Sequence, residues 1–100
     1  MKFTAFVTWI RKECGGRTHA PVEGLRPMIR FQRHIAESLE TGRDIQICGL
    51  RFDQKTWTGE VELARPRGSE PLKEFIKEGE LIELMDGFRV IAVGKIIEVA

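Results

Sequence analysis

The sequence contains few of the residues that build metal sites or reactive thiol pairs. Its 100 residues include two cysteines and two histidines, and the formal net charge at pH 7 is only +1. Cys14 and Cys48 are too far apart for a CxxC zinc or redox motif, and no carboxylates or thiols gather around His19 or His34. We therefore expect no metal site and no overall electric field that recruits nucleic acid.

The two cysteines leave one question open. We expect both thiols to be reduced and partly buried, as is usual for a cytosolic chain. Their even number also allows a Cys14–Cys48 disulfide, which would be unusual in that compartment.

The sequence also lacks a stretch of about 18 apolar residues, the length at which a helix becomes a membrane-span candidate. Residues 1–10 are largely apolar, but they continue into Arg11-Lys12-Glu13 instead of a small-residue cleavage site. We predict a strand at this position, no membrane association and a cytoplasmic location.

Motifs for catalysis and for nucleotide binding are missing as well. Residues 93–96 superficially resemble the end of a phosphate-binding loop, but the GxxxxGK[ST] pattern fails at Arg89 and at Ile96. Glu60 and Glu62 share the solvent face of one predicted strand, where like charges are usually just solvated. We expect a protein that is not an enzyme and that needs no cofactor and no nucleotide.

What the sequence does have is period-two alternation, which is typical of half-buried strands. In residues 2–12 the main apolar face consists of Phe3, Ala5, Val7 and Trp9. The same alternation recurs in residues 28–33, 44–52 and 56–64, where the residues predicted to point inward are Ile29, Phe31, Ile45, Ile47, Trp57, Val61 and Leu63.

Glycine and proline separate these runs. Asp86-Gly87 lies between two apolar strands and predicts a tight hairpin, because a type I′ turn needs positive φ at both central residues. Residues 34–40 fit a short helical turn, and Ser69 is a plausible N-cap for another that ends at Gly79. The sequence therefore predicts one all-β domain over residues 1–100: a closed or nearly closed six-stranded antiparallel β-barrel with one or two short helical turns.

The last strand carries apolar residues on both of its faces. Phe88, Val90, Ala92 and Ile96 alternate with Ile91, Val93, Ile97 and Val99, and the first strand similarly places Phe6 and Ile10 opposite its main apolar face. Either loops and the short helix cover this second face, or it binds a partner or another copy of the chain. The interface candidates are Phe6, Ile10, Ile91, Val93 and Ile97.

Arginines at loops and outer strand positions suggest a different surface. Arginine binds phosphate oxygens bidentately, and several on one face would give a salt-sensitive contact with a nucleic-acid backbone. An ordinary solvated barrel face is the alternative. The aromatic residues that would stack on single-stranded bases are expected in the core, which favours a helical backbone or an acidic protein as the target.

Three blocks of the chain, spanning about half of it, resemble the third, C-terminal domain of elongation factor Tu. They are Phe3–Arg17 with its Gly15-Gly16-Arg17 turn, the stretch Pro21, Gly24, Arg26 and Pro27, and the hairpin Leu81–Ile96 with Asp86-Gly87, Arg89 and Gly94. The strand at residues 58–63 is also similar to the TGxVxL strand of that family.

The resemblance implies a six-stranded antiparallel barrel that binds partners and catalyses nothing. In the family this domain packs against the GTPase and second domains and touches the T stem of aminoacyl-tRNA. The chain contains neither of those domains, so a shared fold does not imply tRNA delivery. We expect a binding module for a protein partner or a second copy; the alternative is a structured-RNA binder that uses Arg17, Arg26, Arg30 and Arg89.

Overall fold

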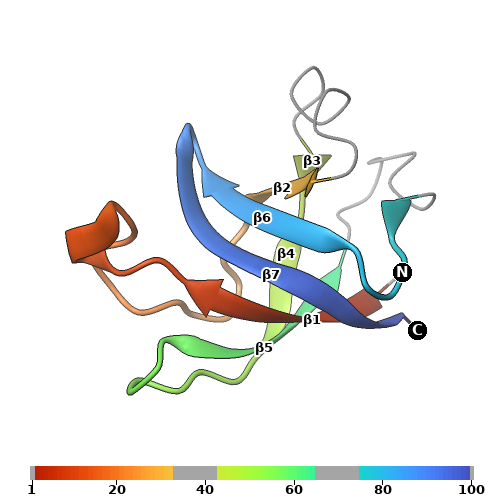
Figure 1. Cartoon of the computed structure of the whole chain (residues 1–100), viewed down its shortest axis with the longest axis horizontal. Helices are drawn as coiled ribbons and strands as arrows, with labels where there is room; N and C mark the ends of the chain where they lie inside the picture. Colours follow the sequence, from red (N-terminus) through yellow and green to blue (C-terminus); the bar gives the residue numbers. More distant parts are fainter. Residues whose placement is uncertain (1, 33–42, 65–74, 100) are drawn as a thin grey trace.

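The protein folds as a single antiparallel sheet that curls into an open half-barrel (Figure 1). The computed structural model describes residues 2–32, 43–64 and 75–99. The strands are β1 (Lys2–Trp9), β2 (Met28–Phe31), β3 (Arg43–Asp44), β4 (Gln46–Leu50), β5 (Thr58–Ala64), β6 (Leu81–Asp86) and β7 (Arg89–Val99). Their order in the sheet is β3-β2-β6-β7-β1-β5-β4. Only Ile45 separates β3 from β4, so together they count as one interrupted strand, which gives the six antiparallel strands predicted from the sequence.

Helix is almost absent from the described part of the chain. The 3-10 turn η1 (Lys12–Cys14), which the sequence did not predict, ends at Gly15 in the left-handed region with φ of 91°. The helical turn predicted at residues 34–40 lies outside the described residues, as does most of the one predicted between Ser69 and Gly79.

The inward-facing residues of the strands form one hydrophobic core, as the alternation predicts. In β1 the alternate residues Phe3, Ala5, Val7 and Trp9 are at most 2% exposed. The inward residues of β2, β4 and β5 are fully buried, and Trp57, which directly precedes β5, is half-buried against the same core. Burial of a large aliphatic or aromatic side chain contributes roughly 1.5–3 kcal/mol each, so this face stabilises the sheet.

Three shifts in register bend the strands. Leu84 pairs with Ala92 while Met85 pairs with Val90, so Ile91 is an extra residue in β7. Similar shifts leave Ile97 as an extra residue opposite β1 and Cys48 as one opposite β5. Because a bulge bends its strand and increases the local twist, the two bulges in β7 let this strand curve around the molecule (Figure 1).

A glycine allows β1 and β7 to approach each other closely. Val7 pairs with Gly94, and a Cβ at Gly94 would overlap the carbonyl oxygen of Phe6 and lie 2.8 Å from the Cα of Val7. A side chain cannot fit there without moving one of the two central strands.

Backbone hydrogen bonds also join the segment before β2 to the β3–β4 strand. The N–H of Gly24 donates to the carbonyl of Ile47 over 2.8 Å, and the N–H of Ile47 donates to that of Leu25 over 2.9 Å. The N–H of Ile45 donates to the carbonyl of Pro27 over 3.0 Å. Residues 24–27, which lead into β2 near one end of the sheet order, are thus hydrogen-bonded to the strand segment that contains β4 at the other end.

Trp57 has a positive φ of 58°, which no other non-glycine residue in the described ranges shows. Its N–H donates to Asp53 and its carbonyl accepts from Trp9, both over 2.7 Å. The guanidinium of Arg11 lies over its ring, 5.2 Å from the centroid, and the ring of Phe52 meets it edge-on. These contacts hold a bulky side chain in a backbone conformation that it rarely adopts.

Candidate binding face

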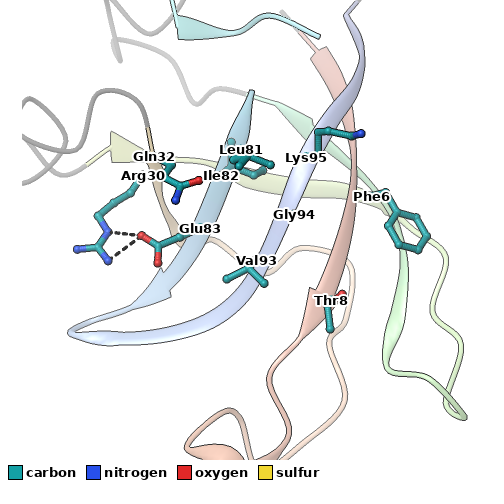
Figure 2. A pocket seen from close by; sticks show the side chains of 10 residues that line it. All are labelled: Phe6, Thr8, Arg30, Gln32, Leu81, Ile82, Glu83, Val93, Gly94 and Lys95. Carbon is teal, nitrogen blue, oxygen red and sulfur yellow. Dashed lines mark hydrogen bonds and ion pairs between the residues drawn. The ribbon is translucent and has the colours of Figure 1, made fainter. Parts of the chain in front are cut away.

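The outer face of β1, β7, β6 and β2 contains an open groove of about 660 Å³. Outward side chains of these four strands make up most of its lining, with Phe6 and Thr8 from β1, Val93 and Lys95 from β7, Leu81 and Glu83 from β6, and Arg30 and Gln32 at β2 (Figure 2). Gly94 and the buried Ile82 complete it. The hydrophobic core occupies the opposite side of the same strands. The groove therefore opens on the outer surface of the sheet, and it shares only Ile82 with the core among its lining residues.

The strand register arranges these side chains in two rows across the sheet. One row runs from Leu81 through Lys95 and Phe6 to Glu60. The next runs from Arg30 through Glu83, Val93 and Thr8 to Thr58. Directly opposed residues in antiparallel strands point to the same face, so each row is a line of neighbouring side chains.

Apolar side chains on this face remain accessible to solvent. Phe6 is 47%, Leu81 49%, Val93 39% and Ile97 38% exposed, and they come from three adjacent strands. Single exposed apolar residues are normal on a protein surface, whereas a group of them on one face marks an interaction site.

An ion pair closes the β2 end of the groove. The Nε and Nη2 atoms of Arg30 both donate to Oε1 of Glu83, over 3.1 and 2.8 Å. The two side chains are 22% and 25% exposed. Because Glu83 already neutralises its charge, Arg30 is a poor phosphate ligand in this arrangement.

Lys95 and Glu60 lie on either side of Phe6 in the first row. Both are exposed, and within the described ranges neither forms an ion pair. In this row of described residues a positive and a negative side chain, neither of them in an ion pair, thus lie on opposite sides of an aromatic side chain.

The structure places the predicted interface residues in three different environments. Phe6, Val93 and Ile97 are exposed on the outer face, and Ile10 is half-buried just after β1. The outward position expected for Ile91 is wrong, because this residue is only 1% exposed. As the extra residue of the β7 bulge it turns inward beside Ala92, so simple alternation assigns it to the wrong face.

The four candidate RNA-binding arginines occupy different settings. Nη1 of Arg89 donates to the carbonyl of Gly16 over 3.3 Å, which brings the β6–β7 hairpin against the Gly15-Gly16-Arg17 turn. Nε of Arg17 donates to the carbonyl of His19 over 3.4 Å. Arg26 is exposed in the loop before β2, and Arg30 is paired with Glu83.

Sequence reasoning missed one exposed aromatic residue. Phe88 was expected on an apolar face of the last strand, but it lies at the tip of the β6–β7 hairpin and is fully exposed. Its position directly after Asp86-Gly87 was the available signal, since residues in a two-residue hairpin loop point away from both strands.

Cys14 and Cys48 are free thiols and are exposed rather than partly buried, and the thiol of Cys48 donates to the carbonyl of Glu62 over 3.3 Å. Among the described residues, no three His, Cys, Asp or Glu side chains gather as metal ligands would. The same part of the chain contains no helix with the length and apolar character needed to cross a membrane.

Neither the protein-family models nor the curated proteins include a match to this chain. The geometry of the outer face and the residue motifs therefore carry the functional proposal.

Proposed function

We propose that this protein is a non-enzymatic binding module, and that the outer face of β1, β7 and β6 is where it binds another protein molecule. The observation that supports the proposal most strongly is the open groove of about 660 Å³, which is lined by three accessible apolar side chains. Protein interfaces combine an apolar centre with a polar rim. Phe6, Leu81 and Val93 supply the centre here, and Lys95 with the Arg30–Glu83 pair supplies the rim.

We also propose that the sheet closes into a barrel like the third domain of elongation factor Tu. Closure is supported by the backbone hydrogen bonds from residues 24–27 to Ile45 and Ile47, and by the single residue between β3 and β4. Closure would pair the edges of the sheet, which protects a barrel from edge-to-edge aggregation. The likeness itself depends on the Gly15-Gly16-Arg17 turn and the Asp86-Gly87 hairpin, and the proposed cytoplasmic location depends on the sequence alone.

Site-specific photocrosslinking in living cells tests the binding face. A photoreactive amino acid replaces Phe6 or Val93 on the face, and Val22 serves as the matched control because it is an exposed apolar residue, 57% accessible, that does not line the groove. We expect discrete protein adducts at Phe6 and Val93 and none at Val22. Equal adduct patterns at all three positions, or no adducts at any of them, would contradict the proposal.

The second candidate function is binding of structured RNA. The contact between Arg89 and Gly16 favours it, because this contact places Arg89 beside the turn that carries Arg17, and Phe88, whose ring is exposed, directly precedes Arg89 in the chain. Arg30 is the weakest member of the proposed set because Glu83 already binds it.

Salt dependence tests this second function. If the RNA backbone is bound, replacing Arg17 or Arg89 by Gln should lower the slope of log K against log salt by about 1 for each arginine. Arg51→Gln is the control, because Arg51 is exposed just after β4 and belongs to a different part of the surface. Unchanged slopes in the first two variants would exclude this site.

A further inference from the structure

We infer that the partner of the outer face is a second copy of this chain, bound in an isologous dimer whose two-fold axis runs along β1 above Phe6. This inference rests on the proposed function, since it names the molecule that occupies the same face. It depends on the order of Glu60, Phe6 and Lys95 across the adjacent strands β5, β1 and β7.

Glu60, Phe6 and Lys95 form a short row with opposite charges at its ends. Phe6 pairs directly with Glu60 on β5 and with Lys95 on β7. Adjacent strands lie about 4.8 Å apart, so the two charged residues are at similar distances on opposite sides of the aromatic ring. Neither charge is used in an ion pair among the described residues.

A two-fold axis parallel to β1 exchanges the two ends of this row. When two copies face each other across that axis, Phe6 meets Phe6 of the second copy, and Lys95 lies opposite Glu60 of the second copy. The reverse contact forms at the same time, because every contact in an isologous interface occurs twice. An aromatic pair at the centre and two ion pairs beside it would then fill the interface.

The charge pattern favours a second copy over a strongly charged partner. A basic or acidic partner would attract one end of the row and repel the other, whereas a second copy satisfies both ends. The neighbouring row brings no like charges together at this point, since Val93 would face Thr58 of the second copy.

The contact must be centred on the Phe6–Thr8 part of β1. At the other end, Thr4 lies between Glu62 and Glu98, and the same axis would bring these carboxylates toward their counterparts. A contact limited to the Phe6–Thr8 part of β1 leaves these carboxylates outside the interface.

The available area indicates a weak dimer. A stable interface buries about 800 Å² on each partner, which is roughly one eighth of the total accessible surface of 6133 Å². A curved outer face with contact confined to one end of β1 supplies less than this, so we expect association in the micromolar range.

Charge reversal tests the inference by sedimentation equilibrium of the purified full chain. Lys95→Glu and Glu60→Lys each place like charges opposite one another at two positions, and each should weaken association at least about 10-fold. The double variant restores opposite charges and should return the dissociation constant to within about 3-fold of the original. An equimolar mixture of the two single variants should form a heterodimer for the same reason.

The controls separate loss of folding from loss of binding. Lys77→Glu reverses a charge in the exposed turn before β6 and should leave association unchanged. Near-ultraviolet circular dichroism confirms that each variant is folded. If the original protein stays monomeric at about 1 mM, or if neither the double variant nor the mixture recovers association, the dimer is wrong. Adducts at Phe6 with a different protein would in that case still support the binding face.

Discussion

Trp57 combines a strained backbone conformation with side-chain and backbone contacts that offset the strain. Its φ of 58° lies in the left-handed region, where a side chain costs about 1 kcal/mol or more. The ring contacts with Arg11 and Phe52 and the two backbone hydrogen bonds hold it there. The sequence predicted that Trp57 would face inward, but its backbone conformation could not be predicted, because alternation says nothing about φ.

Two substitutions at Trp57 distinguish the energetic cost of its positive φ from the energetic contribution of its ring contacts. Trp57→Gly and Trp57→Ala both lose the ring contacts, but glycine adopts positive φ without strain. We expect the glycine variant to be the more stable of the two by about 1 kcal/mol, the reverse of the usual order within a strand. Urea denaturation of both variants measures the difference, and an alanine variant of equal or greater stability would show that φ is not strained.

Phe88 represents the opposite case, a large apolar residue that contributes nothing to the core. Because its ring is fully exposed, Phe88→Ser should change the free energy of unfolding by less than about 0.5 kcal/mol. Phe31→Ala is the reference, since Phe31 is fully buried and its truncation should cost about 3–5 kcal/mol. Thermal unfolding of the two variants measures both effects. A marked loss of stability in the Phe88 variant would show that the hairpin tip packs against the body of the protein.

At the scale of elements, alternation predicted the inward faces of β1, β2, β4 and β5 but failed in β7. The reason is physical: a bulge adds one residue and reverses the alternation beyond it, and its position depends on which strand pairs with which. The Arg30–Glu83 pair was unpredictable for a similar reason, since 53 residues separate its members and only the register of β2 with β6 brings them together. The rows of side chains that define the candidate site could not be predicted either, because they too depend on which strands pair and in which register.

The close approach of β1 to β7 predicts an unusual ranking of glycine substitutions. Gly94→Ala should destabilise the protein by about 3 kcal/mol, because the added Cβ overlaps the backbone of β1. Gly87→Ala should cost only about 1 kcal/mol, since nothing lies near its Cβ position and only the φ of 62° opposes the change. Chemical denaturation ranks the two variants, and the opposite order would show that β7 can move away from β1.

At the scale of the whole molecule, the two faces of the sheet differ in the exposure of their apolar side chains. The inner face builds the core that stabilises the half-barrel, while the outer face keeps four apolar side chains accessible, three of which line a groove. The sequence predicted the apolar character of both faces of the first and last strands, and it named Phe6, Val93 and Ile97 among the interface candidates. It could not predict Leu81 or Lys95 beside them, because these residues join the face only through the pairing of β6, β7 and β1.

The most direct test of the account is a dilution series followed by amide NMR on uniformly nitrogen-15-labelled protein. If the outer face binds a second copy, the amide signals that shift with concentration will come from residues 6–8 of β1, 58–60 of β5 and 93–95 of β7, and they will shift together along a single binding curve. Spectra that do not change up to about 1 mM, or shifts confined to the hairpin tip at residues 86–89 and the turn at residues 15–17, would contradict it.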